Sequence, residues 1–395
     1  MDRFGSPYTP GPGRRPSALV GRSSEIEACQ VLIGRTGNGL TSRSLMLTGV
    51  HGVGKTVLLN ELHRLAEGAG WLTLEIEGNS ADAGRRSTRE RLARELVASA
   101  RTITPRLQQA SEKWDDALRT ISSFTVSAGV GDVPLGAEIE PASGRGDSGD
   151  LGLDIEELVA DVTPALQDGR IGFAVFIDEI QALDEATLSA ILSAQRRAAR
   201  HGRPFYVFGA GLPSVPAILA DARSDTERQF DHLRIGALSS SDTLRALREP
   251  VMQLRVDYDD DALNYLAGAS GGYPLFIQVF GNWAWRLAAA SPITYAEALR
   301  AVTYGKDELD MSLFRSRWDQ ATPQEKDLLR ATAEDDGVSA VRDLPGRMGM
   351  TQLSQISVPR RNLIMKGLLY APERGQLAHM VPHMSAYIRR AHRKG

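Results

Sequence analysis

The residues from Gly49 to Thr56 have the types and spacing of a phosphate-binding loop. They read Gly-Val-His-Gly-Val-Gly-Lys-Thr and match the pattern G-x-x-x-x-G-K-[ST] at every fixed position. The glycines allow positive φ angles, so that successive main-chain N–H groups can converge on phosphate oxygens without interference from a Cβ atom. The lysine then reaches the β- and γ-phosphates as a point charge, and the threonine hydroxyl is a ligand for Mg²⁺. The sequence therefore predicts a P-loop that binds a nucleoside triphosphate with Mg²⁺.

A pair of carboxylates, Asp178 and Glu179, forms the second chemical motif. The pair follows the continuously apolar run Ile171–Ile177, which is typical of a parallel strand covered on both faces. A carboxylate at such a strand end can hold Mg²⁺ through water, and its neighbour can orient or deprotonate the attacking water. This Walker B pattern predicts Asp178 and Thr56 as metal ligands and Glu179, with Lys55, as catalytic.

Strands and helices alternate around these two motifs. We predict strands at 44–48, 71–76, 171–177 and 233–238 and a strand with its turn at 204–213, with helices between them. This order indicates an α/β fold with a five-stranded parallel sheet and helices on both faces. Ligands bind beyond the carboxyl ends of the strands in such sheets, and both motifs are found there.

The length of 395 residues predicts more than one domain. We expect a disordered leader over 1–18, a nucleotide-binding base over 19–238, a helical lid over 239–308 and a winged helix over 309–395. An insertion near 124–150 reads as two β-like pieces, Phe124–Ser127 and Leu135–Ile139, forming a hairpin followed by a mobile loop. The single cysteine, the absence of a long apolar run and an N-terminus without a signal-peptide core favour a cytoplasmic protein with no membrane partner.

Charge is distributed unevenly along the chain. The formal net charge is −3, yet the segment from Gly337 to the end holds ten Lys and Arg against two Asp and Glu. The remaining residues hold 36 against 47, so the C-terminal segment is about +8 and the rest about −11. A basic module for an acidic partner, attached to an acidic remainder, is the simplest interpretation.

The basic C-terminal segment has the element order of a winged helix. A helix starts at Thr322, two more follow near 341–348 and 357–367, and a hairpin turns at Arg374-Gly375. The helix over 357–367 occupies the place of a recognition helix. Its candidate DNA contacts, with the wing tip and the tail, are Arg360, Arg361, Lys366, Arg374, Arg389, Arg390, Arg393 and Lys394. Duplex DNA and a protein partner both fit such a surface.

Taken together, the segment Val20-Gly21-Arg22, the P-loop, the Walker B pair, the lid and the winged helix resemble the AAA+ ATPases. The resemblance covers residues 19–395 and is to the prokaryotic group similar to origin-recognition-type initiators and STAND ATPases. It implies that Leu19-Val20-Gly21 holds adenine and that Gly272-Tyr273-Pro274 is similar to the G-x-P element of STAND proteins. The nucleotide-binding residues so implied are Leu19, Val20, Gly21, Arg22, Gly49, Val50, His51, Gly52, Val53, Gly54, Lys55, Thr56, Val57 and Pro274.

Two positions depart from the family pattern. Members usually have a polar sensor at the end of the fourth strand, where this chain has Gly209-Ala210-Gly211 and where Ser214 is the nearest hydroxyl. This departure favours slow hydrolysis. The arginine finger expected before the fifth strand is Arg223 or Arg228, and Arg228 is our catalytic candidate.

Three functions follow from these residues. The first is an ATP-hydrolysing switch, completed by self-association, whose nucleotide state positions a winged helix on DNA. The second is a regulator that binds nucleotide without turnover. The third is a scaffold whose winged helix binds a protein partner. Glu179 favours the first, whereas the missing polar sensor favours the second.

Overall fold

The computed structural model describes residues 2, 4–78, 85–130, 140–222 and 227–392. These residues fold into two compact units. The sheet unit consists of Arg22–Thr48 and Lys55–Arg234, and the helical unit consists of Met1–Gly21, Gly49–Gly54 and Ile235–Gly395. Within the described ranges, no helix combines the length and the apolar character needed to cross a bilayer.

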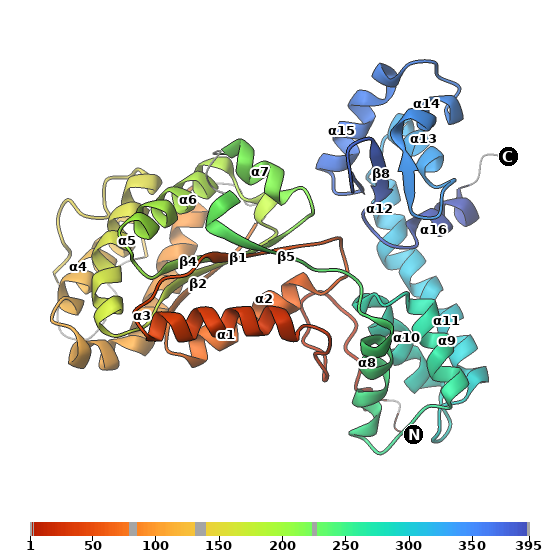
Figure 1. Cartoon of the computed structure of the whole chain (residues 1–395), viewed down its shortest axis with the longest axis horizontal. Helices are drawn as coiled ribbons and strands as arrows, with labels where there is room; N and C mark the ends of the chain where they lie inside the picture. Colours follow the sequence, from red (N-terminus) through yellow and green to blue (C-terminus); the bar gives the residue numbers. More distant parts are fainter. Residues whose placement is uncertain (1, 3, 79–84, 131–139, 223–226, 393–395) are drawn as a thin grey trace. The chain divides into compact units, whose positions relative to one another are not determined.

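The sheet unit is built on a five-stranded parallel sheet, which confirms the predicted α/β fold (Figure 1). Its strands are β1 (Ser44–Thr48), β2 (Leu72–Glu77), β3 (Phe173–Asp178), β4 (Phe205–Gly211) and β5 (Phe230–Arg234). They lie in the order β2-β3-β4-β1-β5, so β4 separates the strand that precedes the P-loop from the strand that ends in the Walker B pair. β1, β3 and β4 are almost entirely buried, as their apolar sequences require.

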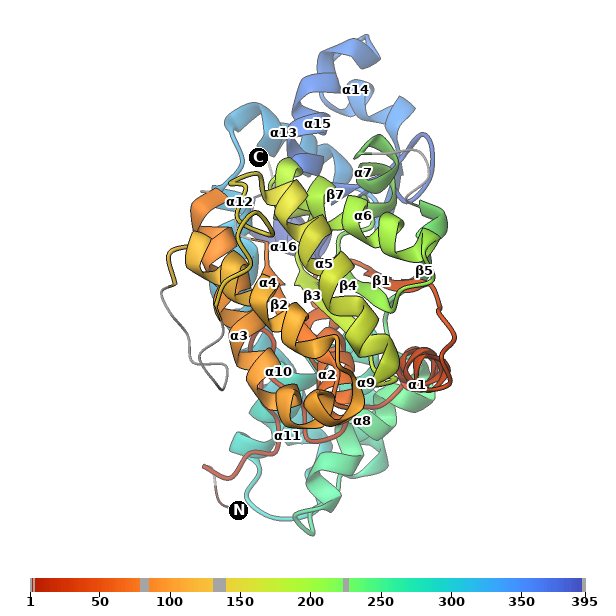
Figure 2. The ribbon, with the colours of Figure 1, turned by 90° about the vertical axis from the view of Figure 1, so that its left-hand side faces the viewer.

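Helices cover both faces of this sheet. They are α1 (Ser23–Gly37), α2 (Lys55–Gly68), α3 (Arg85–Ala110), α4 (Trp114–Ser127), α5 (Leu151–Asp168), α6 (Glu185–Arg200) and α7 (Val215–Ala222), with the short turns η1 (Ile180–Ala182) and η2 (Glu227–Gln229). Phe176 of β3 packs against His63 of α2, with ring centroids 4.7 Å apart. Phe173 and Val175 point to the opposite face, where they line a cavity of about 20 Å³ together with side chains of α3, α4, α5 and α6. Figure 2 shows α5 lying across the strands on that face.

The segment Phe124–Ser127 is helical, so the predicted hairpin is wrong there. It forms the last turn of α4, and Phe124 is buried. The apolar side chains Trp114, Leu118 and Ile121 precede it at helical spacing and are buried on the same helix. The β-branched residues suggested a strand, but the continued helical periodicity outweighs their intrinsic preference. The second predicted strand, Leu135–Ile139, lies outside the described residues.

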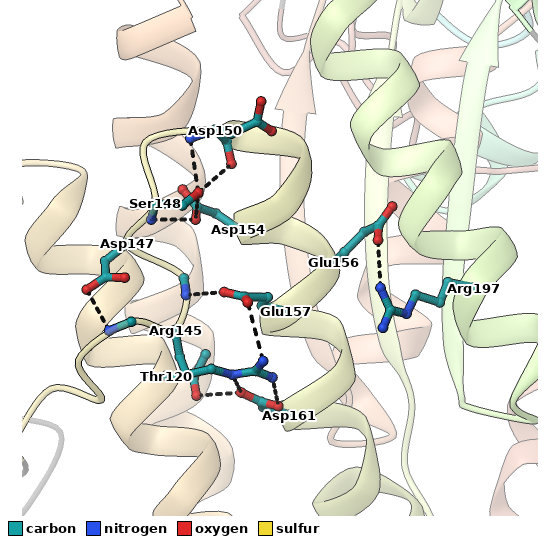
Figure 3. A network of polar contacts seen from close by, with 12 residues as sticks. Thr120, Arg145, Asp147, Ser148, Asp150, Asp154, Glu156, Glu157, Asp161 and Arg197 are labelled. Atoms are coloured by element: carbon teal, nitrogen blue, oxygen red, sulfur yellow. Dashed lines mark hydrogen bonds and ion pairs between the residues drawn. The ribbon is translucent and has the colours of Figure 1, made fainter.

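The described part of the predicted mobile loop is held against α5 by polar contacts (Figure 3). Arg145 donates from Nε to an Asp161 carboxylate oxygen at 3.0 Å, and its Nη1 lies 3.3 Å from Glu157. The Ser148 N–H donates to Asp154 at 2.8 Å. These carboxylates lie along one side of α5, because their spacing of three and four residues repeats with the helix. The prediction of a mobile loop is therefore wrong for residues 140–150.

The helical unit contains the predicted lid and the C-terminal module. Its helices and turns are α8 (Ser240–Met252), α9 (Asp260–Ser270), α10 (Pro274–Leu287), α11 (Tyr295–Leu309), η3 (Asp310–Phe314), α12 (Arg315–Asp319), α13 (Pro323–Thr332), η4 (Val341–Asp343), α14 (Leu344–Arg347), η5 (Leu353–Ile356), α15 (Ser357–Met365) and α16 (Met384–Ala391). An antiparallel sheet, β6 (Val338–Ala340), β8 (Gln376–His379) and β7 (Leu369–Tyr370), includes the hairpin predicted at Arg374-Gly375. One cluster of buried apolar side chains extends from α8 to α16, so the lid and the C-terminal module share a core.

The N-terminal segment is ordered in its described residues, contrary to the predicted disordered leader. Tyr8 is 3% exposed, and its hydroxyl lies 2.6 Å from that of Tyr258 and donates to the Leu247 carbonyl. A Cβ atom at position 281 would lie 2.5 Å from the Tyr8 ring, so Gly281 provides the space for this ring. The Trp285 indole N–H donates to the Asp2 carbonyl at 2.8 Å. Low average hydrophobicity did not reveal that one aromatic side chain anchors the segment.

We predict that Tyr8→Ala destabilises the helical unit by about 3 to 5 kcal/mol, because it leaves an aromatic-sized cavity and unpaired polar groups. Thermal unfolding followed by tryptophan fluorescence measures this effect. Phe4→Ala is the matched control in the same segment, since Phe4 is 99% exposed. Equal unfolding temperatures for the two variants would contradict the packing of Tyr8.

Candidate nucleotide site

The glycines of the P-loop take backbone conformations and contacts that other residues disfavour. Gly52 and Gly54 have φ angles of +81° and +89°. A Cβ atom at Gly49 would lie 2.3 Å from the Ile235 carbonyl oxygen. The loop leaves β1 at Thr48, and α2 begins at Lys55, so the chain follows the strand, loop and helix order that the motif requires.

The P-loop also contacts the start of α10 within the helical unit. The Leu275 N–H donates to the Gly52 carbonyl at 3.2 Å. Pro274 is the first residue of α10, a position that suits proline because a main-chain N–H there would have no partner within the helix. A Cβ atom at Gly54 would lie 4.0 Å from its ring. Gly271 and Gly272 precede it with φ angles of +57° and +75°. The structure thus brings the predicted G-x-P element beside the predicted phosphate loop.

The segment predicted to hold adenine packs against the start of α8. Val20 is buried in the core of the helical unit. Gly21 has a φ angle of +69°, and a Cβ atom there would lie 2.9 Å from both Asp242 and Leu238. Arg22, the next residue, is buried and belongs to the sheet unit.

Lys55, Thr56 and Asp178 come together at the carboxyl ends of the strands. The Thr56 hydroxyl donates to a carboxylate oxygen of Asp178 at 2.7 Å, although 122 residues separate them. Lys55 is buried in the first turn of α2. A hydroxyl and a carboxylate side by side offer the oxygen ligands that Mg²⁺ prefers, so these two residues fit the predicted metal site.

Burial shifts the pKa values of both charged partners. Desolvation lowers the pKa of Lys55, and the carboxylates of Glu179 and Asp178 partly offset this effect. Desolvation raises the pKa of Asp178, although hydrogen bonds from the Thr56 hydroxyl and the Glu179 N–H oppose it. A metal cation bound to Asp178 would favour its ionised form, which agrees with the metal site proposed from the donor atoms.

Glu179 has a left-handed backbone conformation, with φ 46° and ψ 47°, which is uncommon for a residue with a side chain. The turn around it is held by main-chain hydrogen bonds from the Ala182 N–H to the Glu179 carbonyl, at 2.7 Å, and from the Gly78 N–H to the Asp178 carbonyl, at 2.9 Å. A Cβ atom at Gly78 would lie 2.3 Å from the Glu179 carbonyl oxygen. Such strain is concentrated at functional sites, where the surrounding structure holds it.

Gln181 lies beside Glu179 and was not among the residues predicted from the sequence. Its Nε2 donates to the Glu179 carboxylate, and its Oε1 accepts from the Leu212 N–H at 3.1 Å. The signal in the sequence was an amide side chain two residues after the catalytic candidate, in D-E-I-Q.

The glycines at the end of β4 lie close to neighbouring side chains. A Cβ atom at Gly209 would lie 2.6 Å from the Met46 methyl carbon, and one at Gly211 would lie 2.4 Å from Oε1 of Gln181. A side chain at either position would require Met46 or Gln181 to move.

The predicted arginine residues lie on the surface of their own elements. Arg228 is exposed on η2, directly before β5, and Arg223 lies outside the described residues. In the helical unit, Arg361 and Arg374 are exposed and Arg360 is half-buried. None of these three side chains has an ion pair or hydrogen bond with another described residue.

The other basic candidates are bound to carboxylates. Lys366 lies 2.6 Å from Glu325, where burial alone would raise the pKa of the carboxyl but hydrogen bonds from Lys366 and Thr322 lower it. Arg389 pairs with Asp336, and Arg390 pairs with Asp310. Arg393 and Lys394 lie outside the described residues.

Comparison with known families finds two segments of the chain that match a family. Residues 18–208 match the family described as AAA ATPase domain. The predicted AAA+ P-loop ATPase is thus confirmed for this part of the chain. Residues 311–388 match a family described as Domain of unknown function (DUF8462). Comparison with the curated proteins finds no match.

Solved structures resemble the chain over almost its whole length. The Walker-type ATPase PABY2304 of Pyrococcus abyssi has a TM-score of 0.61 at 16% identity, over 95% of this chain and 97% of that one. The RuvB Holliday junction branch migration motor of Thermotoga maritima has a TM-score of 0.47 at 15% identity, over 96% and 99%. The Orc1 protein of Aeropyrum pernix, solved in complex with DNA, has a TM-score of 0.45 at 13% identity, over 95% and 94%. The first likeness is one of fold alone.

We predict that Gly78→Ala destabilises the sheet unit by about 1 to 3 kcal/mol, because the added methyl group must displace the Glu179 peptide. Thermal unfolding measures this difference. Gly68→Ala adds the same methyl group at the end of α2, where no atom lies within 4 Å of it, and serves as the control. Equal stability of the two variants would show that the turn holding Glu179 adapts freely.

Proposed function

We propose that this chain binds ATP with Mg²⁺ and hydrolyses it slowly. The observation that supports the proposal is the convergence of a hydroxyl, an ammonium group and two carboxylates in the sheet unit. The hydroxyl of Thr56 bonds the carboxylate of Asp178, and the ammonium group of Lys55 is influenced by the carboxylates of Asp178 and Glu179. A structural salt bridge alone would not need the glycine loop that precedes Lys55.

Each group has a separate role in this proposal. Main-chain N–H groups of the loop and the ammonium of Lys55 bind the phosphates. Thr56 and Asp178 hold Mg²⁺, which supplies charge neutralisation on the phosphate oxygens. Glu179 accepts a proton from the water that attacks the γ-phosphorus, and the bond from that phosphorus to the bridging oxygen breaks. Arg228 completes the site of a neighbouring copy of the chain.

The remaining nucleotide contacts in the proposal come from the helical unit. Pro274 and the segment Leu19–Gly21 bind the adenosine part of the ligand, and the hydrogen bond from the Leu275 N–H to Gly52 supports the involvement of α10. In this proposal, a change from bound ATP to bound ADP alters the phosphate loop and thereby affects α10, because the Leu275 N–H of α10 bonds the Gly52 carbonyl of the loop.

A regulator that binds nucleotide without turnover is the second candidate. The observation that favours it is the end of β4, Gly209-Ala210-Gly211, where no polar side chain is present to contact the phosphate. The variants Lys55→Ala and Glu179→Gln, described next, distinguish the two candidates.

We predict that Lys55→Ala abolishes ATP binding, whereas Glu179→Gln keeps binding and loses hydrolysis. The alanine removes the cation that the phosphates need, and the amide keeps the shape of the carboxylate but cannot accept the proton. Fluorescent ATP measures binding, and released phosphate measures turnover, which should fall by about 10² or more in Glu179→Gln. Undiminished binding in Lys55→Ala would refute the site. Equal turnover of Glu179→Gln and parent would support the non-hydrolysing regulator.

We further propose that residues 309–395 form a winged helix that binds duplex DNA under the control of the nucleotide. The supporting observation is that Arg360 and Arg361 on α15 and Arg374 in the β7–β8 turn have no acidic partner among the described residues. Unpaired arginines on a helix and an adjacent turn suit phosphates on successive turns of a groove. A protein partner is the alternative outcome of the test below.

Replacing Arg360, Arg361 and Arg374 together by Ala is expected to weaken duplex binding and to make its salt dependence shallower by roughly one unit per lost phosphate contact. Binding is measured by fluorescence anisotropy over a salt series, with ATP and with ADP. The control replaces Arg245, Arg248 and Arg300, which removes the same charge from α8 and α11. Unchanged affinity and slope in the first variant would point to a protein partner.

A further inference from the structure

We propose that Gln181 is a positioning residue for hydrolysis, which ties the Glu179 carboxylate to the end of β4. The inference rests on the proposed function, because it assigns Glu179 as the base. Gln181 belongs to η1, the short turn that follows the Walker B pair. Its side chain bridges two elements, since Nε2 donates to Glu179 and Oε1 accepts from the Leu212 N–H at 3.1 Å.

The chemistry of the two partners fixes the orientation of the amide. A main-chain N–H can only donate, so the group that faces Leu212 must be the carbonyl oxygen. An ionised carboxylate can only accept, so the group that faces Glu179 must be the NH₂. The reversed amide would place donor against donor and acceptor against acceptor. Both contacts therefore specify one orientation, and they specify it independently.

Glu179 needs such a tether because little else directs its side chain. Its backbone is held by the turn, as the bonds from Ala182 and to Asp178 show, but the side chain has three rotatable bonds beyond Cα. Among the described residues, Gln181 is the one whose side chain hydrogen-bonds its carboxylate. A carboxylate held in one direction can meet the same water in every turnover, which a freely rotating one cannot.

Gly211 and Gln181 form a matched pair. The Cβ atom of any other residue at position 211 would lie 2.4 Å from Oε1 of Gln181 and 2.6 Å from a Val215 methyl group. A side chain at position 211 would therefore have to displace the Gln181 carbonyl oxygen or the Val215 methyl group. In this chain the Leu212 N–H, directly after β4, binds Gln181, which in turn binds Glu179. No polar side chain projects from the end of the strand.

The test compares two substitutions that keep the size of the side chain. Gln181→Glu still accepts from the Leu212 N–H but presents a carboxylate to Glu179, and Gln181→Met removes the donor without adding charge. We expect kcat for ATP hydrolysis to fall about tenfold or more in both variants, as for other losses of orientation. KM and the affinity for fluorescent ATP should not change, because Gln181 is not assigned any contact with the phosphates. Gln108→Glu, an exposed position on α3, controls for the added charge.

The split between kcat and KM separates a positioning role from a merely structural one, and unfolding temperatures equal to that of the parent exclude loss of fold. Unchanged or raised kcat in both variants overturns the inference, as does a rise in KM with kcat retained. In those cases an active parent and an inactive Glu179→Gln variant leave the proposed function intact. A parent that does not hydrolyse ATP overturns the proposed function and this inference with it.

Discussion

The hydrogen bond between Thr56 and Asp178 is the contact on which the candidate site depends. It joins the helix after β1 to the end of β3, and β4 lies between these two strands. Between them, β4 ends in Gly209-Ala210-Gly211. The steric limits at Gly209 and Gly211 follow from the same arrangement, because Met46 of β1 and Gln181 after β3 fill the space from either side. The strand order therefore brings the helix after β1 and the end of β3 to the same edge of the sheet.

Sequence patterns predicted the parts of the fold that local rules determine. The P-loop, the apolar run before Asp178 and the hairpin at Arg374-Gly375 each carry their signal within a few residues, and the structure has each at the expected element. The prediction of a strand at Phe124–Ser127 was wrong because it considered the β-branched residues without the apolar spacing of the preceding helical turns. The packing of Tyr8 was not predicted because its partners, Leu247 and Tyr258, are more than two hundred residues away in the sequence. No local rule can detect such a partner.

The residues of the candidate site also fall into those that a local motif predicts and those that depend on distant contacts. Lys55, Thr56, Asp178 and Glu179 were predicted because their motifs encode their chemistry. Gln181 was not predicted, since its role depends on the Leu212 N–H that β4 brings to it, and this requires the strand order.

In the C-terminal segment, the net charge counted along the sequence differs from the charge that is free of internal ion pairs. Counting from Gly337 gave about +8, but the carboxylates that pair with Lys366, Arg389 and Arg390 precede this boundary, at Glu325, Asp336 and Asp310. Arg347 likewise pairs with Asp335 at 2.8 Å. Ion pairs formed between elements on the two sides of an arbitrary boundary inflate the charge assigned to each side. What distinguishes Arg360, Arg361 and Arg374 is therefore not their sign but their lack of a described acidic partner, because a cation without an internal partner can still gain from an external anion.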